Sequence, residues 1–376
     1  MIKTPNYEVK LYLNGTLIGD IRQLAQNLKW VRRRTKVGVD EIDFTLNDVL
    51  FNEWCIARNT DINNMLKPYA LECRIVRNGI EIVGGFLATM PGYSPNGTSA
   101  NLAMRFDGYM NLLAGVYIRP IGTVVGRMGD LIEQFITEAD TRAYNAGKEF
   151  GFFPGEIEVL PSVQQTFDNY KSTKEFFTDR CDNTTGAGPF DIIFDADKTY
   201  NVYSQANAGD IITDWKANYP ASIDTTSAMS ISANEVAGFA SAVIGIGSGE
   251  ISSDPNKNTA IQSFSMNAAK VTEYGYVEEI MQDSSITDQT RLDNNTATKL
   301  FVDSKFVWEP QITLIGTQVE PKPSGTNKIW ICDVITINNT EDLTGMTNGK
   351  FRVNELSVSV SDKNSETITP VLERYS

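Results

Sequence analysis

Histidine is absent from this sequence of 376 residues. Its absence excludes Ser-His-Asp triads, histidine metal sites and imidazole acid–base catalysis. Cysteine is scarce, and the few cysteines lie far apart without a CxxC pair; they are Cys55, Cys73, Cys181 and Cys332. A zinc site would therefore lack ligands, and we interpret these residues as buried thiols of a protein in a reducing compartment.

Long apolar runs are also missing. No stretch reaches the roughly 18 apolar residues that a membrane-spanning helix needs. The N-terminal segment MIKTPNYEVK has no apolar core of the kind found in signal peptides. We therefore expect neither a membrane span nor a secretory leader.

Basic residues are a minority, since 33 Lys and Arg face 47 Asp and Glu for a formal net charge of −14. A chain this acidic repels phosphate backbones, which argues against sequence-specific binding of nucleic acid. Apolar residues make up 41% of the chain and charged residues 21%. These values are typical of a folded protein, and the length favours several domains.

The patterns that are present are mainly those of β-strands. In the first 120 residues, alternating apolar runs are separated by Asn14-Gly15, Asn78-Gly79 and Asn96-Gly97. Asn-Gly is typical of two-residue hairpin turns, whose central residues need positive φ. This region therefore predicts a small antiparallel barrel or sandwich. Strand patterns return in the last 120 residues, where Asn348-Gly349 marks another turn.

The middle of the chain contains helices. Apolar residues at helical spacing predict a helix within 126–144, and a second helix is expected at 173–180. The segment CDNTTGAGP then breaks the chain before a predicted hairpin at 190–202. We predict a mainly β (α+β) protein in which two small β-barrel-like domains flank this helix-containing region. The expected domains are an N-terminal barrel at 1–121, a helical connection at 122–188, an α+β domain at 189–254 and a C-terminal barrel with a helix at 255–376.

Three patterns could bind or react with a ligand, and each has a simpler structural explanation. Asp195 and Asp197 form a DxD that could hold a hard cation, but aspartate is also favoured in hairpin turns. The glycines in GIGSGEISSDPNKN lack the following helix of a phosphate-binding loop, so we interpret this stretch as a linker. The carboxylate pairs could serve a glycosidase, but neighbouring strand residues point to opposite faces; the pairs are Glu278 with Glu279 and Glu133 with Glu138. We therefore expect no catalytic, cofactor-binding or metal-binding residue.

The one basic cluster, WVRRRTKVG, places Arg32, Arg33, Arg34 and Lys36 beside Trp30. Basic residues next to an aromatic ring can bind nucleic acid. Because the chain is so acidic, we expect the cluster instead to cover a strand edge or to contact an acidic partner surface.

Near the C-terminus, a strand is expected at Tyr276–Met281, and residues 285–288 (SITD) fit a capping pattern for a following helix. Leu292, Thr296 and Leu300 lie on one stripe of that helix. With the later strands, this helix is expected to form a compact barrel-plus-helix unit.

Three segments resemble the tail-hub (baseplate hub) proteins of tailed bacteriophages. The segment YGYVEEIMQDSSITDQTRLDNNTATKLF is similar to the family's YG-x-x-E-E strand, loop and helix. The segment FDIIFDADKTYNVYSQANAGDIITDW resembles the hub hairpin and its following Gly-Asp, and FDGYMNLLAGVYIRP resembles the end of the first hub domain. The similarity extends over nearly the whole chain and is structural rather than catalytic.

The resemblance implies a homotrimer without enzymatic activity. In such hubs two barrel domains from each of three chains form a ring that adapts the six-fold tail tube to a three-fold tip and surrounds the DNA channel. The implied partners are tail-tube and distal tail proteins, the tape measure protein, and tip or fibre proteins. The implied location is the virion tail tip, after assembly in the host cytoplasm. Because the sequence stops at VLERYS, any wall-degrading or receptor-binding activity is expected in another protein.

Two other functions fit the same composition. One is a carbohydrate-binding adhesin built as a monomeric sandwich. The other is a glycan-degrading all-β enzyme of the virion or cell surface, which would depend on one carboxylate pair.

Overall fold

The computed structural model describes residues 4–96, 99–181, 189–219, 228–236, 239–250, 259–284, 286–304, 307–315, 329–341 and 348–375. The chain groups into two compact units. Residues 1–233 and 310–376 form unit 1, and residues 234–309 form unit 2. The mainly β class predicted from the sequence is confirmed, and the described sheets do not close into a barrel.

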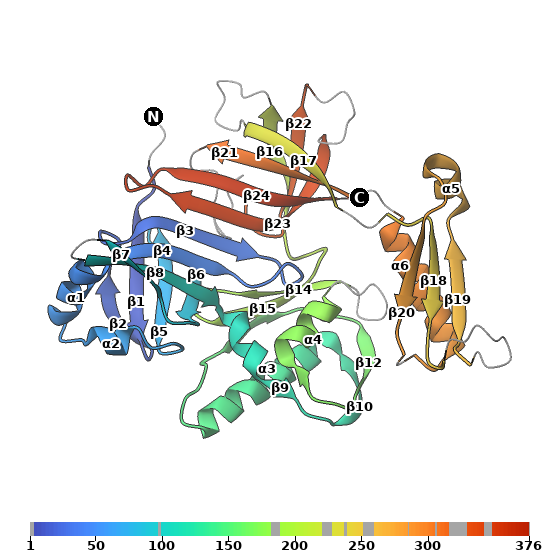
Figure 1. The fold of residues 1–376 in the computed structure, drawn as a ribbon, viewed down its shortest axis with the longest axis horizontal. Helices are drawn as coiled ribbons and strands as arrows, with labels where there is room; N and C mark the ends of the chain where they lie inside the picture. Colours follow the sequence, from blue (N-terminus) through green and yellow to red (C-terminus); the bar gives the residue numbers. More distant parts are fainter. Residues whose placement is uncertain are drawn as a thin grey trace. The chain divides into compact units, whose positions relative to one another are not determined.

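A 14-stranded sheet is the main feature of unit 1 (Figure 1). Its N-terminal strands are β1 (Tyr7–Leu13), β2 (Thr16–Asp20), β3 (Gln26–Arg33), β4 (Glu41–Asn47), β5 (Leu71–Arg77), β6 (Ile80–Leu87), β7 (Gly92–Asn96) and β8 (Ser99–Gly108). Its later strands are β16 (Ile211–Tyr219), β17 (Ala228–Val236), β21 (Val307–Ile315), β22 (Val334–Asn339), β23 (Gly349–Val360) and β24 (Glu366–Arg374). The main path runs β17-β21-β24-β23-β3-β4-β8-β6-β5-β1-β2, so strands from both ends of the chain share one sheet.

The Asn-Gly turns have the conformation that the sequence predicts. Between β1 and β2, Asn14 and Gly15 have φ of 49° and 80°, and between β5 and β6, Asn78 and Gly79 have φ of 53° and 84°. Positive φ at both central residues matches the twist of the flanking strands. Gly97 lies outside the described residues, although Asn96 pairs with Ser99 across the predicted hairpin.

Strand β23 joins the two ends of the chain because it pairs with β3 on one side and β24 on the other. Trp30 of β3 lies opposite Val358 of β23, and its ring centroid is 6.2 Å from that of Trp330. Both tryptophans belong to a core that contains residues of the N-terminal and C-terminal strands. Two helices follow β4 in this region, α1 (Asp48–Ile56) and α2 (Ile62–Met65).

A second core in unit 1 lies among its helices (Figure 1). The helical elements are η1 (Tyr109–Gly115), α3 (Met128–Asn145) and α4 (Thr173–Arg180). The strands between and after them are β9 (Tyr117–Ile118), β10 (Gly122–Arg127), β11 (Phe153–Ile157), β12 (Ser162–Phe167), β13 (Lys171–Ser172), β14 (Phe190–Phe194) and β15 (Thr199–Ser204). Both predicted helices and the predicted hairpin of β14 and β15 are confirmed. The predicted break after Cys181 falls on residues 182–188, which lie outside the described residues.

Unit 2 is a three-stranded sheet with two helices. Its elements are β18 (Ala242–Ile246), β19 (Gln262–Met266), α5 (Ala268–Tyr274), β20 (Glu278–Gln282) and α6 (Gln289–Asp303). Asp288 caps α6 by accepting the N–H of Arg291 at 2.8 Å, while Ser285 lies outside the described residues. The predicted stripe of α6 is buried, with Leu292, Thr296 and Leu300 between 0% and 8% exposed.

The grouping differs from the expected barrel-plus-helix unit. Helix α6 belongs to unit 2, whereas β22, β23 and β24 belong to the large sheet of unit 1. The reason is that β23 pairs on one side with β24 and on the other side with β3, which is far away in the sequence. The finer division at 121, 188 and 254 stays a prediction.

Candidate functional site: a buried polar cluster at the end of β3

The basic segment predicted for a strand edge or partner surface lies inside unit 1, so that prediction is wrong. Strand β3 has β23 and β4 on its two sides and is not an edge. Arg32 and Arg34 are only 2% and 1% exposed. A buried guanidinium needs carboxylate and hydrogen-bond partners, and several parts of the chain supply them.

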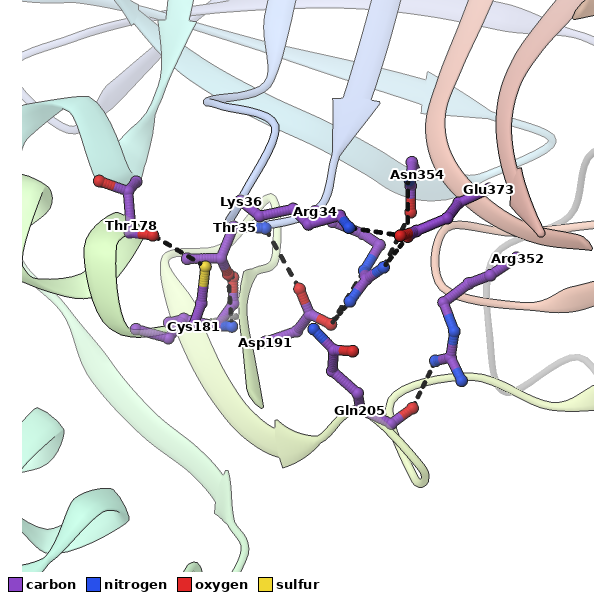
Figure 2. A network of polar contacts seen from close by, with 11 residues as sticks. Arg34, Thr35, Lys36, Thr178, Cys181, Asp191, Gln205, Arg352, Asn354 and Glu373 are labelled. Atoms are coloured by element: carbon purple, nitrogen blue, oxygen red, sulfur yellow. Dashed lines mark hydrogen bonds and ion pairs between the residues drawn. The ribbon is translucent and has the colours of Figure 1, made fainter. Parts of the chain in front are cut away.

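Arg34 is the centre of this cluster (Figure 2). Its Nε donates to Asp191 Oδ2 at 3.0 Å, and its terminal nitrogen lies 2.9 Å from the same oxygen. Another terminal nitrogen donates to Asn354 Oδ1 at 2.8 Å. Asp191 is fully buried, so the two charges form a pair without access to water. We call Arg34, Thr35, Lys36, Asp191, Asn354 and Glu373 the Arg34 cluster.

Glu373 forms the side of the cluster that lies nearer to solvent. Its Oε2 accepts from Lys36 at 2.7 Å and from Asn354 at 3.2 Å, and Arg34 lies 3.4 Å away. Burial alone would raise the pKa of Glu373, but Lys36, Asn354 and Arg34 together hold it below its ordinary value. For Arg34, burial opposes the charge, but Asp191 keeps the pKa of the guanidinium above its usual range.

Neighbouring contacts join β3 to β14. The Thr35 hydroxyl accepts the N–H of Ile192 at 2.7 Å and donates to the Ile192 carbonyl at 3.1 Å. Arg32 donates to the Phe194 carbonyl at 2.9 Å and forms an ion pair with Asp40 at 3.1 Å. These side-chain hydrogen bonds thus take the place of the backbone hydrogen bonds that would link two paired strands. Figure 2 also shows Arg352 bonded to the Gln205 carbonyl on the other side.

The chemistry of the Arg34 cluster is structural. An arginine cannot act as a proton donor or acceptor at ordinary pH, and Asp191 and Glu373 already accept charged donors. The nearby thiol of Cys181 donates to the Thr178 carbonyl at 3.1 Å. The cluster holds three distant segments of chain together, which is a different role from that expected for these arginines.

The DxD residues make local hydrogen bonds, as the turn interpretation predicts. Asp197 Oδ1 accepts the N–H of Thr199 at 3.0 Å, and Asp195 Oδ2 accepts from Asn201 at 2.9 Å. Lys198, which follows Asp197, has φ of 74°, which fits a tight turn from β14 to β15. Among the described residues, no group of three or more His, Cys, Asp or Glu side chains is arranged to hold a metal ion.

The glycine-rich stretch expected as a linker begins inside a strand. Gly245 lies in β18, and a Cβ at this position would lie 2.0 Å from Thr296 Oγ1 of α6. The glycine therefore lets the helix approach the sheet closely. Residues 251–258 of the expected linker lie outside the described residues.

Members of both carboxylate pairs considered for a glycosidase contact neighbouring side chains. On β20, Glu278 is exposed and Glu279 is half-buried, and Glu279 pairs with Lys299 at 2.7 Å. On α3, Glu138 accepts from Gln134 at 3.0 Å.

A cleft of about 550 Å³ in unit 1 is lined by Asp195 of the DxD and by two carboxylates that the sequence did not indicate, Glu156 and Glu158. Glu158 accepts from the Ser204 N–H at 2.7 Å, the Ser204 hydroxyl at 2.9 Å and Asn207 at 2.8 Å. Burial raises the pKa of Asp195. Because three hydrogen-bond donors already occupy the Glu158 carboxylate, it is poorly suited to attack a substrate.

The cysteines are buried thiols outside any disulfide, and burial raises the pKa of Cys55 to about 11. Such thiols are poor nucleophiles, because the thiolate is the reactive form. No helix within the described residues has the length and apolar character required to cross a membrane.

Comparisons with known proteins give a structural match without a sequence match. No family model and no curated protein matches the sequence. The 43 kDa tail protein of prophage MuSo2 from Shewanella oneidensis is 11% identical, with a TM-score of 0.61 over 97% of this chain and 98% of that chain. A tail protein from Neisseria meningitidis MC58 is 10% identical, with a TM-score of 0.63 over 98% and 97%. Prophage tail protein gp18 from Listeria monocytogenes EGD-e is 12% identical, with a TM-score of 0.51 over 97% and 94%.

These matches extend over nearly the full length of both chains, so the similarity concerns the whole architecture rather than one domain. At such low identity they establish the fold alone. The predicted resemblance to tail-hub proteins is confirmed at this level: the chain has the fold of phage tail proteins.

Proposed function

We propose that this chain is a structural protein of the tail tip or baseplate hub of a tailed bacteriophage or prophage. The observation that carries the proposal is the near-complete overlap with three tail proteins. A structural role also agrees with the Arg34 cluster, whose buried charges are used for internal contacts.

The finer proposal is a trimeric ring that adapts the six-fold tail tube to a three-fold tip and encloses the DNA channel. In the described part of the chain, β2 and β17 each pair with one neighbour. Such strands have free backbone groups that another subunit or tail protein can pair with. The net charge of −14 would also prevent DNA from adhering as it passes.

The proposed partners are tail-tube and distal tail proteins, the tape measure protein and tip or fibre proteins, and the proposed location is the virion after assembly in the host cytoplasm. In this proposal the chain is not an enzyme. Any enzymatic step of infection would then be carried out by one of these partners.

The first test is the mass of the purified protein by light scattering, together with labelling of assembled tails by a specific antibody in electron microscopy. A mass of three times the 41.7 kDa chain and a label at the tail tip would support the proposal. A stable dimer would contradict the trimeric ring. Label along the tube or its absence from tails would contradict the tip location.

A further inference from the structure

A pocket of about 500 Å³ in unit 1 combines positive charge with apolar walls. It lies beside α3, the segment from η1 to β9, and Tyr170 before β13. Its two charged side chains are Arg119 and Arg142, and none of the described residues that line it is Asp or Glu. Positive charge without acidic neighbours is unusual on a chain with a net charge of −14.

Arg142 is held in place but keeps its charge available. Its Nε donates to the Glu138 carbonyl at 3.2 Å, and a terminal nitrogen donates to the Tyr117 carbonyl at 2.9 Å. Because both acceptors are neutral carbonyls, they orient the guanidinium without compensating its charge. A group oriented in advance loses less conformational entropy on binding.

Six other arginines of the described chain are engaged with carboxylates. Those with ion pairs are Arg32, Arg33, Arg34, Arg74, Arg77 and Arg105. Neither Arg119 nor Arg142 forms an ion pair with a described residue, and Arg119 is exposed. The pocket therefore presents two uncompensated guanidinium groups to solvent.

The walls of the pocket are aromatic and aliphatic. Tyr117 and Tyr170 are 50% and 69% exposed, while Phe150 and Val116 are partly buried beside them. Tyrosine and arginine together are typical of the energetically dominant residues of protein interfaces. A ligand for this pocket would thus carry both an anionic group and an apolar group.

We infer that this pocket binds an acidic peptide segment of a protein partner, in which a carboxylate lies next to an apolar side chain. The carboxylate would accept from Arg119 and Arg142, and the apolar side chain would lie against Tyr117 and Tyr170. Nucleic acid fits less well, because the strongly acidic chain repels a polyanion and two arginines neutralise few phosphates. A peptide with one or two carboxylates needs no more than two guanidinium groups.

The test uses the full chain and three fluorescein-labelled probes in a polarisation assay. They are a short peptide with a Glu-Phe-Glu centre, the same peptide with Gln-Phe-Gln, and single-stranded DNA. We expect the Glu peptide to bind at least about tenfold more tightly than the Gln peptide, and Arg119→Ala or Arg142→Ala to weaken it about tenfold each. Both effects should diminish as salt is raised.

Arg127→Ala is the matched control, because this exposed arginine of β10 does not line the pocket. It should leave peptide binding unchanged, and circular dichroism checks that each variant is folded. Equal binding of the Gln peptide, or equal losses in Arg127→Ala and Arg142→Ala, would overturn the inference. Tighter binding of DNA that depends on Arg142 would also overturn it and assign the pocket to nucleic acid. The assay uses the isolated chain, so a negative result leaves the proposed tail function untouched.

Discussion

Replacing Arg34 with alanine should destabilise unit 1 more than removal of any exposed arginine. The substitution removes the bonds of Arg34 to Asp191 at 2.9 and 3.0 Å and to Asn354 at 2.8 Å. Asp191 would then be a buried carboxylate that has lost its guanidinium partner, while the N–H of Thr35 still donates to it at 3.3 Å. A buried carboxylate that has lost its counter-charge is less stable than the same carboxylate in water.

The expected loss is about 3–5 kcal/mol, the range for breaking a buried ion pair from one side. Domains of this kind have unfolding free energies of about 5–15 kcal/mol, so the loss is a large part of the total. The value follows from burial, since Arg34 is 1% exposed and Asp191 is 0% exposed. The same pair at the surface would be worth about 0–1 kcal/mol.

The assay is equilibrium unfolding in urea followed by tryptophan fluorescence. Trp30 and Trp330 report on unit 1, because both lie in its larger core. A shift of the midpoint without a change of slope would give the free-energy difference directly.

Arg105→Ala is the matched control. Arg105 also pairs with two carboxylates, Glu41 at 2.7 Å and Asp107 at 3.4 Å, but its side chain is 58% exposed. Its removal should cost about 0–1 kcal/mol. The double variant of Arg34→Ala with Asp191→Ala should be more stable than the sum of the single losses predicts, because both partners of the buried ion pair are removed together. Equal losses in Arg34→Ala and Arg105→Ala, or additive losses in the double variant, would refute the reasoning.

Three further predictions concern other parts of the chain. Gly245→Ala should destabilise unit 2 by about 1–3 kcal/mol, because the added Cβ would lie 2.0 Å from Thr296 Oγ1; faster amide hydrogen exchange in α6 would show this, and unchanged exchange would contradict it. Lys36→Met should cost about 1 kcal/mol or less at neutral pH. The pKa of Glu373 is lowered in the folded state. The stability that Lys36 contributes through Glu373 is therefore present above the unfolded pKa of Glu373 and disappears as pH falls through its folded pKa. The urea midpoints of wild type and variant should accordingly converge in acid and not at neutral pH. The four cysteines should react with a thiol reagent only after unfolding, since all are buried and the pKa of Cys55 is raised to about 11; a fast-reacting thiol in the native protein would contradict this.

Local patterns predicted those parts of the fold that depend on neighbours in sequence. The Asn14-Gly15 turn and the N-terminal hairpin follow from φ preferences of two residues. Helix α3 follows from apolar spacing that matches 3.6 residues per turn, and α4 begins where Ser172 accepts the N–H of Glu175. In each case the information that determines the structure lies within a few residues.

The role of the arginines in β3 could not be predicted in this way. The carboxylates that pair with Arg34 lie 157 and 339 residues further along the chain. One local signal was available, because Trp30 and Arg32 alternate along β3 and therefore share a face, and Arg34 follows directly after the strand. A buried tryptophan on that face indicates that the arginines are buried too. Net charge favoured the opposite interpretation, since it averages over the molecule and says nothing about a single strand.

The pocket of Arg119 and Arg142 also has no sequence signature. These residues belong to different elements, β9 with its following turn and α3, and become neighbours only through the packing of the second core. Spacing rules find a site when its residues lie on one element. They fail when each element contributes one or two residues.

The buried charges also explain how a sheet built from strands of both ends of the chain can have a single strand register. Strand β23 must find β3 across more than 300 residues of intervening chain, with Glu355 opposite Arg33. Apolar strands of this kind could pair in a shifted register at little loss of buried area. This holds for a shift by two residues, which keeps each side chain on its face, whereas a shift by one residue would turn each side chain to the other face. Arg34 would then lose Asn354 as a partner, and a buried guanidinium that lacks one of its hydrogen-bond acceptors would cost about 1–3 kcal/mol. We infer that the Arg34 cluster selects the register by penalising the alternatives, which is a use for buried ion pairs that adds little net stability.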